Sequence, residues 1–151
     1  MASQDHGPLG SLVRGVAAGA AGTAAMTAAQ TAYYKATGSE PSGTPAEVAK
    51  RLIGGVLQRP VPEDRDGLLN NVMHWAYGTG WGGLLGLAAA GRRPGAGVLF
   101  GLTVWGASLV ELPAMQLAPP VWEYDPKTIA SDVGFHLVYG MAAAAAYRAL
   151  A

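Results

Sequence analysis

The sequence predicts an all-α membrane protein, built as a bundle of four transmembrane helices with one amphipathic interfacial helix in the first long loop. Half of the 151 residues are hydrophobic and only 13% are charged, which is about half the charged share of a soluble domain. The 22 glycines lie mostly inside apolar runs, where small residues let membrane helices approach closely. We therefore expect a single transmembrane domain over residues 1–151.

Four apolar segments are each long enough to cross a bilayer, which takes about 20 residues. The expected spans are residues 12–36, 71–91, 96–115 and 129–149. The first apolar run continues beyond the core of a signal peptide, so we interpret it as a retained span. Trp75, Tyr77 and Trp81 crowd the start of the second span, as the aromatic belt at a membrane interface does.

Glycines recur at spacings of three and four in three of these segments, which places them on one side of a helix. In a bilayer such a face packs against another helix. The predicted packing residues are Gly15, Gly19, Gly22, Gly78, Gly82, Gly86, Gly97 and Gly101.

The long connection between the first two spans predicts an amphipathic helix at about residues 45–58. Thr44 and Glu47 have the spacing of a capping box, with Pro45 at the first helical position. The segment is too short and too charged to span, so we expect it to lie on the membrane surface or to cap the bundle. The side chains expected to be buried are Val48, Leu52, Val56 and Leu57.

A short motif occurs twice: Asn or Asp, three residues, His, two residues, Tyr-Gly. It runs from Asn70 to Gly78 and again from Asp132 to Gly140. Residues three and four apart share a helix face, so each copy predicts a polar stripe at the mouth of a span. A weaker echo between the segments 15–19 and 97–101 indicates two tandem helix hairpins of the same orientation.

Alternating spans bring the ends of the first and third to the membrane face where the second and fourth begin. Ionisable residues within spans are costly and usually face the bundle interior or a cavity. We therefore predict one polar pocket, in which His74, Glu111 and His136 titrate as a coupled unit. Its candidate residues are His74, Tyr77, Glu111, Asp132, His136 and Tyr139.

Other interpretations of these residues stay open. The His and Tyr side chains are also suited to bonding lipid headgroups at the interface, and Glu111 to reaching water from the last turn of its span. Two axial histidines would suit a haem between the second and fourth spans. A metal site of His74, His136 and Glu111 is a further alternative, although no cofactor is predicted.

Several classes of function are excluded by composition and motif content. The chain has no cysteine, and it shows no phosphate-binding loop, no Ser-His-Asp order and no paired carboxylates, so we do not expect an enzyme. A net charge of zero gives no reason to expect nucleic-acid binding. The expected partner is the lipid bilayer, with a homo-oligomer formed through the glycine faces as an alternative.

The stretch from Pro113 to Glu123, followed by Ser131-Asp132 and by Gly134 to Val138, resembles the YagU-like family of bacterial inner-membrane proteins. That family has a similar Pro-x-Met-x-Leu-x-Pro-Pro run, then an acidic residue and a Gly-His-Leu-Val-like segment. Here Phe135 separates Gly134 from the histidine. The resemblance covers the C-terminal third, and it implies a small multi-pass inner-membrane protein linked to acid tolerance. It marks Pro119, Pro120 and His136 as family-type positions and implies no catalytic role.

The leading expectation for function is a membrane protein whose pH-sensitive pocket assists proton or small-solute movement. An accessory protein that assembles through glycine-rich faces is the second, and a haem or metal redox protein is the third. Arg14, Arg148 and the Arg92-Arg93 turn would share one side of the membrane. By the positive-inside rule, we expect both termini in the cytoplasm of a bacterial cell.

Overall fold

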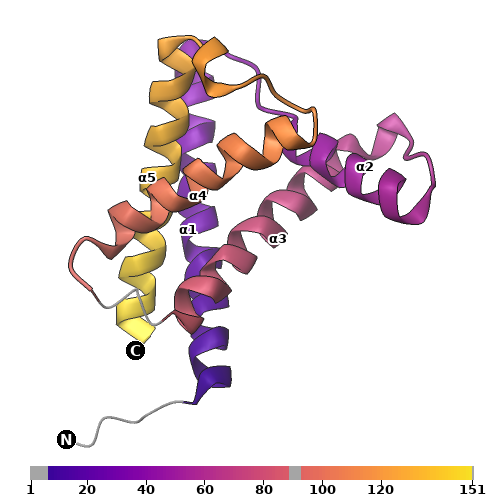
Figure 1. Ribbon diagram of the computed structural model, residues 1–151. Coiled ribbons are helices and arrows are strands. Elements are labelled where there is room, and N and C mark those ends of the chain that lie inside the picture. The colour runs from indigo at the N-terminus through magenta and orange to yellow at the C-terminus, as the bar shows by residue number, and fades with distance from the viewer. Residues whose placement is uncertain (1–6, 89–92, 151) are drawn as a thin grey trace, which may run out of the picture.

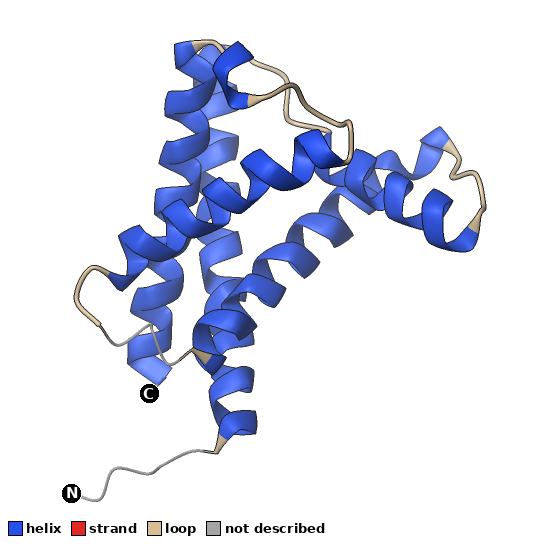
Figure 2. Cartoon of the chain, viewed as in Figure 1, coloured by secondary structure: helices blue, strands red, loops and turns tan. Residues whose placement is uncertain are grey.

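The computed structural model describes residues 7–88 and 93–150, and within these ranges the chain is entirely helices and loops (Figures 1 and 2). The α-helices are α1 (Pro8–Thr37), α2 (Thr44–Leu57), α3 (Asp66–Leu87), α4 (Ala96–Ala114) and α5 (Pro126–Leu150). The 3-10 turns η1 (Glu63–Arg65) and η3 (Val121–Glu123) precede α3 and α5. The end of the expected second span, residues 89–91, lies outside the described residues, as does Arg92.

Helix α1 lies between α3 and α5, and α4 packs on α5 and crosses obliquely in front of α1 (Figure 1). The arrangement is thus a row, α3–α1–α5–α4, whose last member folds back toward the first. Helices α4 and α5 are long and apolar enough to cross a membrane, with 28% of each apolar window buried. Helices α1 and α3 do not reach the same hydropathy, because α1 is rich in alanine, glycine and threonine, and α3 is rich in glycine and contains Asn70, Asn71 and His74.

Helices α1 and α3 meet backbone to backbone through glycine. A Cβ added to Gly19 would lie 2.9 Å from the Cα of Gly82, and one added to Gly15 would lie 2.9 Å from the Cα of Gly86. Gly78 faces the side chain of Thr23 on α1. The two helices run antiparallel, since residues later on α3 meet residues earlier on α1. Any side chain at these positions would separate the helices.

Helices α4 and α5 form a second contact of the same kind. A Cβ on Gly97 would lie 2.7 Å from the Cα of Met141, and one on Gly140 would lie 2.7 Å from the Cα of Gly101. Gly140 was not among the residues expected to pack helices, although it ends the second copy of the repeated motif. Gly22 faces α5 and not α3: a Cβ there would lie 3.0 Å from the Cβ of Ala143.

The two hairpins echo each other, with an offset of one helical turn. In the first, Gly82 lies against Gly15 and Gly19; in the second, Gly140 lies against Gly97 and Gly101. The sequence repeat aligns Gly140 with Gly78, but the glycine of α3 that makes the corresponding contact is Gly82, four residues later. The sequence repeat therefore marks two similar helix pairs but not identical contacts. The buried core between them is formed by Ala18, Leu85, Phe100, Val104, Tyr139, Ala143 and Tyr147.

Helix α2 extends sideways from the long helices and packs on α3 (Figure 1). The face that it buries is small: Ala46 is 3% exposed and Ala49 is 7% exposed. Leu52 and Val56, which were expected to be buried, are instead 46% and 77% exposed. Alanine allows a closer approach to α3 than leucine does, and the larger side chains lie to one side of the contact. Val48 is half-buried, and the Leu57 side chain lies outside the described residues.

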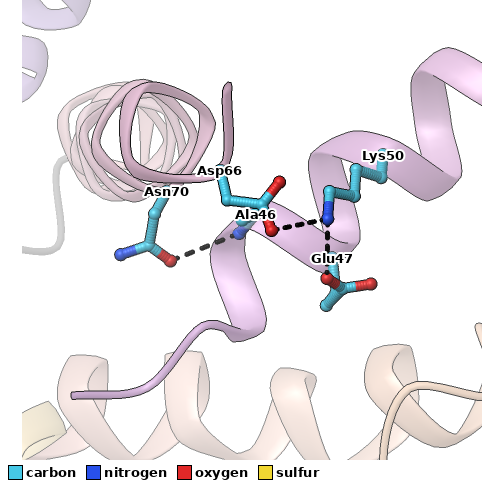
Figure 3. A network of polar contacts seen from close by, with 5 residues as sticks. All are labelled: Ala46, Glu47, Lys50, Asp66 and Asn70. Atoms are coloured by element: carbon cyan, nitrogen blue, oxygen red, sulfur yellow. Dashed lines mark hydrogen bonds and ion pairs between the residues drawn. The ribbon is translucent and has the colours of Figure 1, made fainter. Parts of the chain in front are cut away.

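The expected capping box does not form. Gly43 is the N-cap, without a side-chain capping bond, and Thr44 already lies inside the helix, where its hydroxyl accepts a hydrogen bond from Ser42 at 2.9 Å. The cap comes from α3: the Asn70 carboxamide oxygen accepts the Ala46 N–H at 3.3 Å (Figure 3). The same N–H also donates to the Gly43 carbonyl at 3.0 Å, so Asn70 supplies a second acceptor from a residue distant in sequence.

Candidate functional site

Helices α3 and α4 are joined by a polar contact between Tyr77 and Glu111. The Tyr77 hydroxyl donates to the Glu111 carboxylate at 2.7 Å. Tyr77 is half-buried, and Glu111 lies near the end of α4, where this helix has crossed toward α3 (Figure 1). A hydrogen bond to an ionised carboxylate is stronger than one between neutral groups. This contact therefore brings together two of the residues expected in the pocket.

An aromatic contact supports the same junction. Trp81 lies one turn after Tyr77 on α3, and their rings meet edge to face with centroids 6.1 Å apart. Trp81 also contacts Phe100 of α4 in an edge-to-face arrangement at 6.5 Å. Phe100 in turn lies against Tyr139 at 5.5 Å, so the ring series reaches the core. The Tyr77–Glu111 bond thus lies at the outer end of a packed aromatic cluster.

His74 bonds to α1 and not to Glu111. Its Nε2 lies 3.1 Å from the Thr27 hydroxyl, and that hydroxyl donates its only proton to the Thr23 carbonyl at 2.8 Å. Because the hydroxyl proton is already used, Nε2–H must be the donor to Thr27. In the neutral ring, Nδ1 of His74 then carries the lone pair and is the atom that can take up a proton.

His136 has the opposite tautomer. Its Nδ1 lies 2.7 Å from the backbone carbonyl of Asp132, and a carbonyl can only accept, so Nδ1–H donates. The lone pair of the neutral ring then lies on Nε2. The contact within the motif is thus made by the Asp132 backbone carbonyl. Both Asp132 and His136 are partly buried.

Tyr139 lies in the core and outside the polar contact. It is buried, and its hydroxyl donates to the Gly78 carbonyl of α3 at 2.6 Å. Tyr147, about two turns later, donates to the Gly86 carbonyl at 3.3 Å. These two hydrogen bonds join α5 to α3 about two turns apart and fix the position of α3 along the axis of α5. Sequence reasoning missed Tyr147, although its spacing from Tyr139 equals the spacing between Gly78 and Gly86.

The residues expected in one pocket therefore lie in separate contacts. Among the described residues, no ion pair joins Glu111 to His74 or to His136. Within the same ranges, no group of three His, Cys, Asp or Glu side chains lies close enough to hold a metal ion. The geometry offers a Tyr–Glu contact between α3 and α4, a Thr–His contact between α1 and α3, and a histidine on α5 bonded to its own helix.

Two polar networks outside the long apolar stretches fix the helices that carry these residues. At the start of α3, Lys50 of α2 lies 2.7 Å from Asp66 and 3.2 Å from Glu47 (Figure 3). The Asp66 carboxylate beside it raises the pKa of Lys50. One oxygen of Asp66, Oδ1, is buried and has no hydrogen-bond partner in the described part of the chain. With the Asn70 cap, this network holds α2 against α3 within one turn of His74.

At the start of α5, Asp125 acts as the N-cap immediately before Pro126. Its Oδ1 accepts the backbone N–H of Lys127 at 2.9 Å and of Thr128 at 3.0 Å. Its Oδ2 accepts the Thr128 hydroxyl at 2.6 Å. These bonds favour the ionised form and hold the pKa of Asp125 below its usual range, with the Thr128 hydroxyl as the largest cause.

Comparison with known proteins adds no assignment. A scan of protein-family models and searches of curated proteins and of solved structures found no match to this chain.

Proposed function

We propose that this is a four-span membrane protein in which Tyr77 and Glu111 form a proton-responsive contact between α3 and α4. The 2.7 Å hydrogen bond between them carries the proposal, because it places a carboxylate at the junction of two largely apolar helices. Ionisable residues in such helices are costly and usually serve a function. The spans of the proposed arrangement are α1, α3, α4 and α5.

Outward-facing apolar side chains support the membrane assignment. Each of the four long helices carries large hydrophobic residues that nothing in the described chain covers. Those exposed on the surface include Leu9, Val13, Leu84, Leu87, Leu99, Val110 and Met141. Exposed large apolar side chains thus occur on all four long helices, and a bilayer would cover them.

The lower hydropathy of α1 and α3 is compatible with spanning, because their threonine hydroxyls donate hydrogen bonds to backbone carbonyls of the same helix. Thr23 donates to the Gly19 carbonyl, and Thr27 donates to the Thr23 carbonyl, both at 2.8 Å. On α3, Thr79 donates to the Trp75 carbonyl at 2.7 Å. A hydroxyl bonded to its own helix costs little in hydrocarbon. At 22 residues, α3 is also about 33 Å long, enough for a hydrocarbon core of about 30 Å.

The proposed response follows from the chemistry of the contact. Ionised Glu111 accepts a charge-assisted hydrogen bond from Tyr77. A proton on Glu111 removes the charge and weakens that bond, so the end of α4 is held less firmly against α3. The response would couple acidity on one side of the membrane to the separation of α3 and α4.

The resemblance to the YagU-like family is consistent with this proposal. It supports an inner-membrane location and a role in acid tolerance, by assisting the movement of protons or of a small solute. We propose that both termini are cytoplasmic, which puts the start of α3 at the outer face and Tyr77 about halfway along that helix. A homo-oligomer through the glycine faces is less favoured, because Gly15, Gly19, Gly82 and Gly140 already pack within the chain.

The test is the distance between α3 and α4 as a function of pH. The chain has no cysteine, so spin labels can be placed at Val72→Cys and Val110→Cys, both on exposed positions. In bilayer nanodiscs, we expect the distance to increase as the pH falls. Glu111→Gln and Tyr77→Phe should each remove the pH dependence. A matched pair at Val16 and Leu84, across the glycine-packed helices α1 and α3, should not respond.

Two results would contradict the proposal. One is a distance between α3 and α4 that stays constant from neutral to acidic pH. The other is a pH-dependent distance that persists in Glu111→Gln. A haem is tested separately by visible absorbance of the purified protein. An iron-porphyrin band would support the alternative that the protein is a haem redox protein.

A further inference from the structure

Helix α2 is the part of the chain that the proposed function leaves unexplained. Its axis is at a large angle to those of α1 and α5, and it lies to one side of both, packed on the start of α3 (Figure 1). The attachment is specific: Ala46 and Ala49 are buried there, Asn70 caps the helix, and Lys50 bonds Asp66 and Glu47 (Figure 3). Such a set of contacts holds α2 in one orientation.

That orientation gives α2 two different free faces. Glu47 and Arg51, four residues apart, share a polar face that borders a shallow groove reaching Leu117. Leu52 and Val56, also four residues apart, share an apolar face that is largely exposed. In water, this apolar face would remain unfavourably hydrated, and the described chain does not cover it.

We infer that α2 lies in the boundary between the headgroups and the acyl chains of the bilayer, with Leu52 and Val56 in contact with lipid. The inference rests on the proposed four-span arrangement, which places the start of α3 at a membrane face. A helix with one apolar and one polar face, too short to span, is suited to that position.

The place at which α2 is attached supports lipid as the occupant. Leu68 and Val72, on the first turns of α3, are also exposed, on the side of that helix away from Asp66 and Asn70, which bond α2. If α3 enters the bilayer here, lipid surrounds its first turns at the level at which α2 is attached. The exposed apolar residues of α2 then meet the same layer of the bilayer as Leu68 and Val72.

The charge of the segment that contains α2 indicates whether the charge of the lipid headgroups matters for its binding. Residues 40–66 include four basic and five acidic side chains. The basic residues are Lys50, Arg51, Arg59 and Arg65, and the acidic residues are Glu40, Glu47, Glu63, Asp64 and Asp66. The segment is thus slightly acidic and is not drawn to anionic headgroups. Contact must come from the apolar side chains, so vesicles of neutral phosphatidylcholine should suffice.

The experiment measures which solvent surrounds each face of α2. Single cysteines at Leu52, Val56 and Arg51 are spin-labelled in the full chain, reconstituted in phosphatidylcholine vesicles. Relaxation by oxygen, which concentrates in lipid, is compared with relaxation by a water-soluble nickel chelate. We expect the oxygen-to-nickel ratio to be several-fold higher at Leu52→Cys and Val56→Cys than at Arg51→Cys. Leu99→Cys on α4, 70% exposed in the wild type, is the reference for a spanning helix.

The outcomes separate this inference from the proposed function. A lipid-like ratio at Leu99→Cys with water-like ratios at positions 52 and 56 overturns the inference and leaves the four spans standing. A water-like ratio at Leu99→Cys contradicts the membrane assignment itself. Spin–spin broadening at Val56→Cys that disappears on dilution with unlabelled protein would show that a second copy covers the face, which also overturns lipid contact.

Discussion

At the scale of single residues, the tyrosines show how similar motifs acquire different roles. Tyr77 and Tyr139 occupy the same place in the two copies of the repeat, yet Tyr77 bonds the Glu111 carboxylate and Tyr139 bonds the Gly78 carbonyl. The difference comes from their neighbours. Tyr139 faces α1 and α3 in the core, whereas Tyr77 faces the end of α4, where a carboxylate is available.

Asp125 provides a test at this scale that is independent of the proposed function. Hydrogen bonds from Thr128 and Lys127 lower its pKa in the folded protein, so its capping contribution is present at neutral pH. That contribution begins to fall below the unfolded pKa of about 3.9 and is lost as the pH drops through the folded pKa. We expect the hydrogen-exchange protection of the first α5 amides, corrected for intrinsic rates, to fall in acid.

Two substitutions distinguish the charge of Asp125 from its capping geometry. Asn is as good an N-cap as Asp, so Asp125→Asn should keep protection without the acid-dependent loss. Asp125→Ala should lower protection at every pH. Equal protection in wild type and Asp125→Ala at neutral pH would mean that the observed bonds do not hold the start of α5.

At the scale of helices, the closest packing depends on glycine at particular positions. Gly82 and Gly80 lie two residues apart on α3, but a Cβ on Gly82 would meet the backbone of Gly15 and Gly19, whereas one on Gly80 would meet open space. The two positions therefore form a matched pair. They separate loss of helix packing from any general effect of replacing glycine.

We expect Gly82→Ala to lower the free energy of unfolding by about 1–3 kcal/mol, the usual cost of overpacking. Gly80→Ala should be neutral or stabilising by up to about 1 kcal/mol, since alanine favours helix more than glycine. The measurement is reversible unfolding in mixed micelles. If both variants lost the same stability, the α1–α3 contact could not be as close as described.

The residues that attach α2 to α3 differ from those that its apolar pattern predicted. The pattern predicted that Leu52 anchors the helix, but Ala49 is the buried residue and Leu52 lies outside the contact. We expect Ala49→Asp to detach α2 and to increase tryptic cleavage at Lys50 and Arg51. Leu52→Asp should leave cleavage close to that of wild type. Rapid cleavage in Leu52→Asp, with Ala49→Asp protected, would restore the original expectation.

At the scale of the whole molecule, periodicity and composition predicted the helices but not how they pair. The approximate positions of the helices followed from apolar runs and from Pro45, which lies in the first turn of α2, but α3 begins at Asp66, ahead of the expected start at residue 71. The partner of Asn70 could not be predicted, because its contact with Ala46 depends on how α2 folds back. Likewise, the direction of α4 decides that Glu111 meets Tyr77 and neither histidine.

Membrane orientation is a prediction at the same scale. Helix α1 begins and α5 ends at one end of the molecule, with Arg14 and Arg148 nearby (Figure 1). That end carries four of the ten Lys and Arg side chains and the opposite end six, so the count alone does not place it in the cytoplasm. We expect it there because the short Arg92-Arg93 turn has no acidic neighbour, whereas the six are accompanied by acidic residues. We expect Gly43→Cys, in the connection between α1 and α2, to react with an impermeant thiol reagent added outside intact cells. Reaction only after the cytoplasm is opened would reverse the orientation.

The most direct test of the central claim is the protonation of Glu111 itself, followed by infrared difference spectroscopy in bilayers as the pH is lowered. We predict a carboxylic C=O band that appears on acidification, is absent in Glu111→Gln, and shifts to higher frequency in Tyr77→Phe, because the carbonyl loses a hydrogen bond. A spectrum that Glu111→Gln leaves unchanged, or a Glu111 band that Tyr77→Phe does not shift, would contradict a proton-responsive contact between α3 and α4.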